Sequence, residues 1–128
     1  MTLEIRSEER VEVRDVTDEV AEAVPDGADG VCTVFVRHTT AGVVVNEDED
    51  RLLADVEEAL ERLVPRDGGY RHDDLDGNAD AHLRAMLLGS SVSIPVEDGE
   101  LALGTWQSVL FVECDGPRTR SVTVTTVE

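Results

Sequence analysis

Apolar and polar residues alternate along some stretches of the chain and repeat at helical spacing along others. Residues 2–14 alternate in a way that predicts a hairpin turned around Ser7–Glu9. Residues 30–37 are apolar on both faces, which predicts a central strand. Further strands are predicted at residues 43–45, 91–96, 100–103, 106–114 and 119–127.

Three segments have the pattern of helices. Residues 17–24 predict a short helix capped by Thr17. Residues 48–63 carry one apolar stripe with acidic residues opposite it, which is typical of an amphipathic helix. A second long helix is expected to begin after Asn78, a good N-cap residue, and to stop at Gly89.

These elements favour one fold class. Strands outnumber helices, and short turns join the late strands, so we expect an α+β fold with a largely antiparallel sheet. A chain of 128 residues has the size of one domain, and no repeat or linker divides it, so a single domain over residues 1–128 is predicted.

The charge of the chain limits its partners. It carries 29 acidic residues against 11 basic ones, all of them Arg, for a formal net charge of −18. Binding to a nucleic-acid backbone or an anionic membrane requires a basic surface. We therefore expect neither a nucleic acid nor a membrane as partner.

The acidic excess also predicts a halophilic protein, because like charges hardly repel at about 1 M salt, where the Debye length is roughly 3 Å. The melting temperature is expected to rise with KCl concentration. Thermal unfolding followed by circular dichroism across a KCl series checks this. A chain that is most stable in dilute buffer contradicts the prediction.

The compartment is predicted from apolar content and cysteines. No stretch approaches the ~20 apolar residues of a membrane span, and charges occupy the N-terminus where a signal peptide needs an apolar run. Cys32 and Cys114 each lie in an apolar strand-like run, which favours two buried thiols over one disulfide. We therefore expect a cytoplasmic protein.

The three histidines are candidates for a shared site. His38 follows the predicted central strand, His72 lies in a loop, and His82 lies in the first turns of the second long helix. His82 shares a helix face with Leu83 and Met86, so it is expected to point inward. Three imidazoles are able to hold a catalytic zinc ion, and they are equally able to act as acid, base and phosphate donors without a metal.

An acidic run from Asp73 to Asp80 invites a calcium interpretation, which the spacing excludes. An EF-hand loop begun at Asp74 would need Gly at residue 79 and Glu at residue 85, and both are Ala. A turn leading into a helix cap is the simpler account. A functional Asp76 or Asp80 beside His82 stays open, since carboxylates often orient histidines.

A pair of arginines stands out near the C-terminus. Arg118 and Arg120 would project to the same side of an extended segment and are able to bind phosphate, or they pair with Glu113 or Asp115. Spacing alone does not decide between the two. Ser90 offers a further hydroxyl donor, and Thr39 and Thr40 are equally ambiguous.

Four segments together resemble the YjbQ family, also called UPF0047. They are HTTAGVVVNEDED (38–50), DGNADAHLRAMLLGSS (76–91), GELALGTWQSVLFVECDGPRTR (99–120) and the stretch from Pro65 to Tyr70-Arg71-His72. The resemblance runs over nearly the whole chain. It implies an α+β fold built on a mostly antiparallel β-sandwich, with two main helices and a short third, usually assembled as a homotrimer.

The resemblance also implies site residues. The family's pocket pattern, to which we add Ser90, falls on His38, Thr39, Thr40, His72, Asp76, Asn78, Asp80, His82, Glu113, Arg118 and Arg120. We assign catalytic roles to His38, Asp76, His82, Glu113 and Arg118. Thr39, Thr40, Asn78, Ser90 and Arg120 are the expected substrate-binding residues. His38, His72 and His82 are the expected ligands if a divalent metal, zinc or magnesium, is bound.

The sequence leaves three functions open. The resemblance implies an enzyme with thiamine-phosphate synthase-like activity, generally regarded as secondary in the family. The alternatives are a zinc-dependent phosphate-ester hydrolase and a non-catalytic protein that binds an anionic metabolite. All three share a small phosphorylated ligand as the expected partner.

Overall fold

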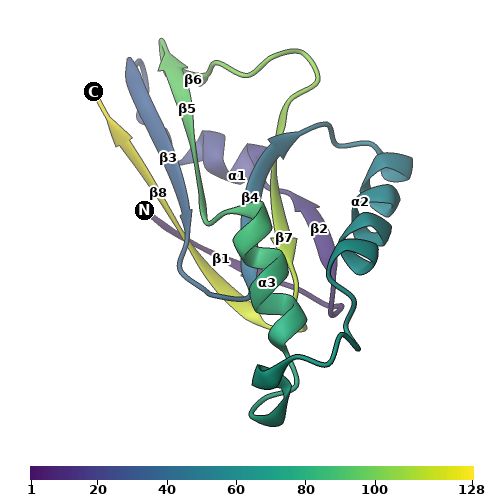
Figure 1. The fold of residues 1–128 in the computed structure, drawn as a ribbon. Coiled ribbons are helices and arrows are strands. Elements are labelled where there is room, and N and C mark those ends of the chain that lie inside the picture. Colours follow the sequence, from purple (N-terminus) through teal and green to yellow (C-terminus); the bar gives the residue numbers. More distant parts are fainter.

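Two antiparallel sheets form the body of the computed structural model, which describes residues 1–128 (Figure 1). The five-stranded sheet has the order β1-β8-β3-β5-β6, and its strands are β1 Thr2–Arg6, β8 Thr119–Val127, β3 Gly30–Val36, β5 Ser91–Glu97 and β6 Glu100–Leu101. The three-stranded sheet has the order β2-β7-β4, with β2 Glu12–Asp15, β7 Ser108–Glu113 and β4 Ala41–Asn46. The predicted α+β fold with antiparallel sheets is confirmed, and β3 is a central strand as its two apolar faces suggested.

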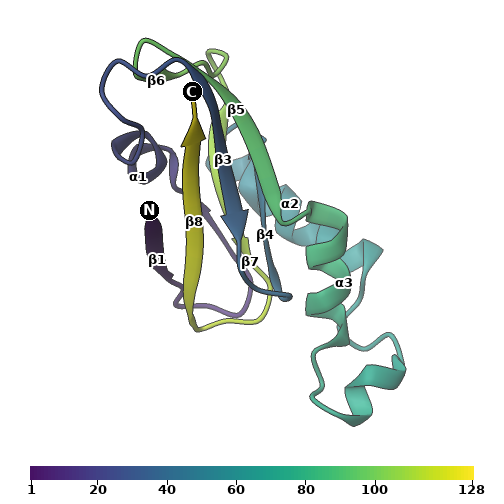
Figure 2. The same cartoon turned by 90° about the vertical axis from the view of Figure 1, so that its left-hand side faces the viewer.

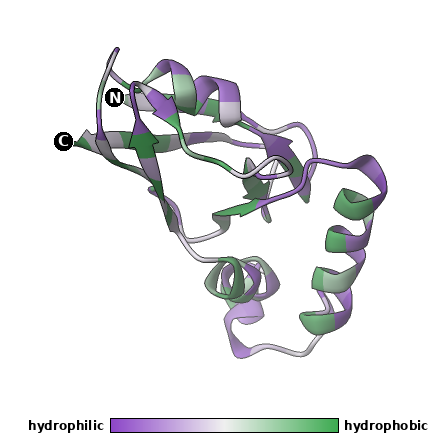
Figure 3. Cartoon of the chain, turned by 90° about the horizontal axis from the view of Figure 1, so that it is seen from above, coloured by the Kyte–Doolittle hydropathy of each residue, from purple (hydrophilic) through white to green (hydrophobic).

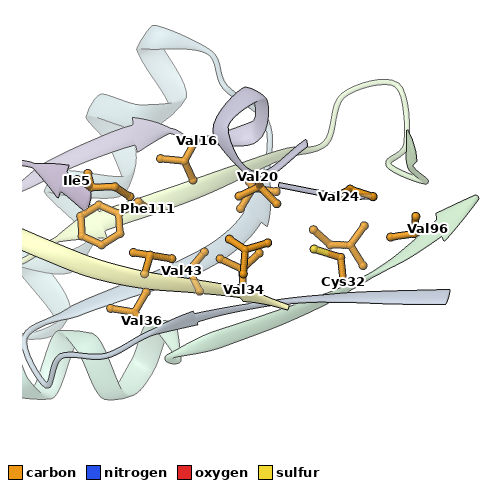
Figure 4. Close-up of a cluster of buried hydrophobic side chains, with 14 of the residues drawn as sticks. Ile5, Val16, Val20, Val24, Cys32, Val34, Val36, Val43, Val96 and Phe111 are labelled. Atoms are coloured by element: carbon orange, nitrogen blue, oxygen red, sulfur yellow. The ribbon is translucent and has the colours of Figure 1, made fainter. Parts of the chain in front are cut away.

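The main core lies between the two sheets and is almost entirely aliphatic (Figure 4). Alternate residues of β3 (Cys32, Val34 and Val36) face Val43 of β4 and Phe111 of β7 across it. Phe111 is the one aromatic residue in this cluster and is fully buried. The remaining members come from the other strands, α1 and the loop after it: Ile5, Val16, Val20, Val24, Ala28, Ala41, Ile94, Val96, Val109, Val122 and Val124.

The helix α1 Thr17–Glu22 contributes Val20 to the main core. The other helices are α2 Asp50–Leu63, the 3-10 turn η1 Arg71–Asp74 and α3 Ala79–Leu88, and they have no residue in that core. A second cluster of Leu60, Ala81, Val112 and Cys114 joins α2 and α3 to the outer face of the three-stranded sheet. Seen from above, α2 stands at the periphery beside α3 (Figure 3).

The predicted hairpin at residues 2–14 is wrong. Both strands exist, but β1 pairs with β8 in one sheet and β2 pairs with β7 in the other. Alternation shows which side chains face the core but does not identify the pairing partner. The segment between the strands is a crossover, and the buried Ser7 anchors it by accepting the backbone N–H of Arg118 at 2.9 Å.

Of the two predicted helix caps, Thr17 is wrong and Asn78 is confirmed in its position only. The cap position of α1 is Val16, while the Thr17 hydroxyl donates to Asp15 and accepts the N–H of Val109 at 2.8 Å. Asn78 does occupy the cap position of α3, but its side chain does not cap the helix. The Oδ1 atom of Asp73 accepts the Ala79 N–H at 3.0 Å instead.

The cysteines and the helix lengths agree with the sequence. Cys32 and Cys114 are both buried and unpaired, as predicted. Burial raises the pKa of the Cys114 thiol to about 12. None of the helices is long and apolar enough to cross a membrane.

Three crossovers between the sheets converge at one end of the sandwich, the lower end in Figure 2. They are the connections from β1 to β2, from β3 to β4 and from β7 to β8. The N-terminal part of α3 lies beside them (Figure 2). This convergence collects the polar segments that the sequence singled out.

Candidate functional site

The crossover loops and the start of α3 enclose a cleft of about 410 Å³ with no apolar residue in its lining. We call it the polar cleft. It is lined by Arg37, His38, Thr39, Thr40, Asp76, Asn78, His82, Asp115, Arg118 and Arg120. The β3–β4 and β7–β8 loops are tied together by the Cys114 N–H, which donates to the Thr40 carbonyl at 3.1 Å.

Glu113 and Arg120 form a buried ion pair beneath this cleft. Their side chains are 0% and 4% exposed. Arg120 Nε donates to Glu113 at 2.8 Å and a terminal nitrogen donates to Thr40 Oγ1 at 2.8 Å, while Glu113 accepts from the Ser7 hydroxyl at 2.8 Å. Burial alone would raise the pKa of Glu113, but the hydrogen bonds from Arg120, the Asp115 N–H and Ser7 hold it below its ordinary value.

This pair changes the predicted roles of three residues. Glu113, one of the two predicted catalytic carboxylates, is fully buried and held by its partners, so it is not free to exchange a proton with a ligand. Arg120 is neutralised by Glu113, and Thr40 is occupied in binding Arg120. These contacts join the β3–β4 crossover to the β7–β8 crossover.

The predicted arginine pair is also separated. Arg118 lies just before β8 and turns back to Asp115, donating from Nε to its carbonyl at 2.8 Å and from a terminal nitrogen to its carboxylate at 3.0 Å. Asn78 donates to the same carboxylate at 2.9 Å. The side chain of Arg118 is 54% exposed, whereas that of Arg120 is 4% exposed and paired with Glu113.

Asp80 anchors a second buried network that sequence reasoning missed. Arg10 of the β1–β2 crossover donates two hydrogen bonds to it, at 2.9 and 3.0 Å, and Arg84 lies 3.5 Å away on the next turn of α3. Burial would raise the pKa of Asp80, but the hydrogen bonds and charge of Arg10, followed by the charge of Arg84, lower it. Arg84 also donates to the Val64 carbonyl after α2.

The inward face of α3 therefore differs from the predicted one. Leu83 and Met86, which were expected to point inward with His82, are exposed. The buried residues of α3 are Ala79, Asp80, Ala81, Arg84 and Ala85. Apolar spacing selected the wrong face because the buried Arg84 is compensated by the Glu61 carboxylate of α2 and by Asp80 one turn earlier in α3. The sequence feature that indicated a buried charge was the Arg in the middle of this short, apolar helix.

His38 has a defined protonation state. Its Nε2 accepts the backbone N–H of Ser121 at 2.8 Å, so this nitrogen carries no proton and the neutral ring has its proton on Nδ1. Burial lowers the pKa of His38, and the charges of Arg120, Arg118 and Arg37 lower it further against the opposite effect of Glu113. His38 is therefore a neutral hydrogen-bond donor.

The three histidines do not fit the expected metal site. No group of three or more His, Cys, Asp or Glu side chains in the chain is arranged to hold a metal ion. The rings of His72 and His82 are close, with centroids 4.8 Å apart and edge to face, and His72 Nε2 lies 3.9 Å from Asp76. His38 lacks a free lone pair, because Ser121 occupies Nε2 and Nδ1 carries the proton.

One atom of the cleft lining, Asn78 Oδ1, is buried and forms no hydrogen bond. His72 Nε2 is also buried without a hydrogen-bond partner, but His72 does not line the polar cleft. Buried polar atoms normally find a partner in the protein or in ordered water. Together with the exposed Arg118 and the neutral His38, Asn78 Oδ1 gives the cleft unused hydrogen-bonding capacity.

Arg37 is the cleft residue that sequence reasoning missed. It is exposed, directly precedes His38, and its guanidinium forms no ion pair. The signal was its position at the end of a central strand in a chain poor in basic residues. Of the predicted binding residues, Thr39 lines the polar cleft, and Ser90 lines an adjoining cavity instead.

Known proteins resemble this chain over its whole length. A family model described as UPF0047 protein YjbQ-like matches residues 1–128. A UPF0047 protein of Archaeoglobus fulgidus is 55% identical over 124 residues, which cover 97% of this chain and 98% of the relative. A UPF0047 protein of Bacillus subtilis, YugU, is 36% identical over 94% of this chain and 92% of its own.

Solved structures agree with the fold. A hypothetical protein from Aeropyrum pernix K1 superposes with a TM-score of 0.95 at 43% identity, covering 99% of this chain and 96% of its own. A YbjQ-like protein of unknown function from Sulfolobus solfataricus P2 gives a TM-score of 0.90 at 35% identity, over 97% and 92% of the two chains.

These comparisons correct the functional expectation. The family model and the relatives are described only as UPF0047 proteins, and one structural neighbour is described as a protein of unknown function. None of these descriptions names an enzymatic activity. The assignment of thiamine-phosphate synthase-like activity to this chain is therefore wrong, and no reaction is derived from its residues.

Proposed function

This chain belongs to the UPF0047 YjbQ-like family, and we propose that its polar cleft binds a small phosphate-bearing molecule. The observation that carries the proposal is the unpaired Arg37 beside the half-exposed Arg118. A chain with a net charge of −18 places these two cations at one hollow of its surface. Such a site attracts a small anion and excludes an extended polyanion.

Neutral donors in the cleft complete the proposed site. His38 offers an Nδ1–H that its hydrogen bond with Ser121 fixes, and Thr39 offers a hydroxyl beside it. Arginine forks match the geometry of phosphate oxygens, and charge-assisted hydrogen bonds are about twice as strong as neutral ones. Asp115 does not repel the anion strongly, because Arg118 and Asn78 already bind its carboxylate.

Removal of the unpaired cation tests the proposal. Arg37→Gln is expected to weaken the binding of inorganic phosphate about tenfold, because a hydrogen bond to a charged group contributes ~1.5–3 kcal/mol. Isothermal titration calorimetry with inorganic phosphate measures the effect.

The matched control is Arg66→Gln. Arg66 is exposed, and it lines neither the polar cleft nor the adjoining cavity, yet the substitution removes the same charge from the chain. It should leave the affinity almost unchanged. Equal weakening in both variants would mean that phosphate responds only to the overall charge, and no binding to the unmodified protein would remove the proposal altogether.

Assembly and location belong to the same proposal. We propose that the chain assembles as the expected homotrimer. Val31 and Val127 on the five-stranded sheet are exposed and offer apolar surface for contact with a second copy. We also keep a cytoplasmic location, in line with the two cysteines that remain thiols. No step of the proposal uses a metal ion.

A further inference from the structure

A second cavity adjoins the polar cleft and has a different chemical character. Its volume is about 790 Å³, and it lies between the end of β3 and the helix α3. It shares Arg37, His38, Thr39 and His82 with the polar cleft. Beyond these shared residues its lining is mostly apolar, so the two hollows form one continuous site with a charged end and an apolar end.

The apolar end is formed by large side chains that no other part of the chain covers. Phe35 and Met86 are 45% and 78% exposed, and both line the cavity. Its space exists because small residues, Ala41 and Ala85, lie at the base where larger side chains would fill it. Large exposed apolar side chains beside a hollow are typical of a ligand site.

The order of the residues sets the orientation of the ligand. Phe35 and Arg37 are two residues apart at the end of β3, with the buried Val36 between them, so they project to the same side of the strand. Met86 follows His82 by one turn of α3, which places these two side chains on one helix face. Each wall of the cavity therefore carries an apolar side chain next to a polar one: Phe35 next to Arg37 at the end of β3, and Met86 next to His82 on α3.

Resting on the phosphate site proposed above, we infer that the ligand is a phosphomonoester with an apolar organic group. The phosphate lies in the polar cleft against Arg37, and the apolar group lies between Phe35 and Met86. A methionine side chain adapts to irregular shapes and packs well against a ring, which suits it to one wall of such a cavity. A sugar or glycerol phosphate would leave hydroxyl groups against these apolar walls without partners.

Three probes separate this inference from the phosphate site itself: inorganic phosphate, glycerol 3-phosphate and phenyl phosphate, each measured by calorimetry. Phenyl phosphate is expected to bind at least tenfold more tightly than glycerol 3-phosphate, because apolar area is buried at about 25 cal/mol per Å². Inorganic phosphate is expected to compete with it.

Met86→Ser should remove most of this preference and leave the affinity for inorganic phosphate unchanged. The matched control is Leu87→Ser, because Leu87 is the next residue of α3, is exposed and does not line the cavity. Phe35→Ser is a second variant on the other wall and should act in the same way.

Different results would refute the phosphate site and the apolar subsite. If inorganic phosphate binds through Arg37 but phenyl phosphate binds no more tightly than glycerol 3-phosphate, the apolar subsite is refuted and the phosphate site stands. Loss of all phosphate binding refutes both. If Met86→Ser changes the oligomeric state in size-exclusion chromatography and leaves the preference intact, this surface contacts another copy of the chain, and the inference is overturned.

Discussion

Glu113→Gln is expected to lower the free energy of unfolding by about 3–5 kcal/mol, the cost of leaving one member of a buried ion pair without its partner. Arg120, whose side chain is 4% exposed, would keep its charge with no carboxylate beside it. Urea unfolding measures the loss. The matched control is Glu58→Gln on the exposed face of α2, which should change the stability by less than about 0.5 kcal/mol.

A double variant and a pH series separate charge from packing. Glu113→Gln with Arg120→Met removes both charges and should recover much of the loss. The pKa of Glu113 is lower in the folded state, so its contribution to stability is present above the unfolded pKa, about 4.3, and is lost as the pH falls below it. Glu113→Gln should flatten this acid limb. An unchanged acid limb would contradict the role given to the pair.

Asp80→Asn is expected to destabilise the protein by about 3 kcal/mol and to loosen α3 before the rest of the fold. Asp80 is fully buried and accepts two hydrogen bonds from Arg10, and Arg84 lies within 3.5 Å. The amide leaves Arg10 without the carboxylate that accepts its two hydrogen bonds, and it leaves Glu61 as the one carboxylate paired with Arg84. Hydrogen exchange of the α3 amides, together with urea unfolding, measures the effect.

Asp55→Asn is the control for this second substitution. Asp55 is exposed on α2 and forms no ion pair, so the same loss of one carboxylate charge should leave both measurements nearly unchanged. If the two variants unfold alike, or if α3 exchanges no faster in Asp80→Asn, then the network around Asp80 does not hold the helix.

Both buried networks lie at the end of the sandwich where the crossovers meet. Glu113 and Arg120 tie β7 to the start of β8 and to Thr40, and Arg10 with Asp80 ties the β1–β2 crossover to α3. The loops that form the cleft are thus fixed by charged side chains that are themselves buried. Because these side chains hold the loops, Arg37 and Arg118 remain accessible to a ligand.

Much of the fold was predictable from local patterns. The apolar alternation of β3, the stripe of α2 and the glycine after α3 identified these elements to within a few residues, because period and end signals are local properties of the chain. The hairpin at residues 2–14 failed for the complementary reason. Strand pairing depends on which distant segment covers each strand, and alternation contains no such information.

The residues that gather at the candidate site were largely predictable from the sequence, but the roles of several of them were not. The segments that contain His38, Asn78 and Arg118 were singled out, and the structure brings them to one cleft. Glu113 and Arg120 were assigned to chemistry, whereas the structure buries them against each other. Sequence spacing does not distinguish a buried charge pair from an accessible one, because their difference is solvent exposure.

The sequence by itself therefore determined the α+β class, the family, the two unpaired cysteines and the set of polar segments. The family followed from the resemblance of four segments, and the rest followed from periodicity, composition and order along the chain, none of which requires knowledge of the packing. The tertiary structure alone decided which charges neutralise one another, the neutral state of His38 and the contiguity of a charged and an apolar hollow. These properties depend on distances between residues far apart in the sequence, and only the folded chain sets those distances.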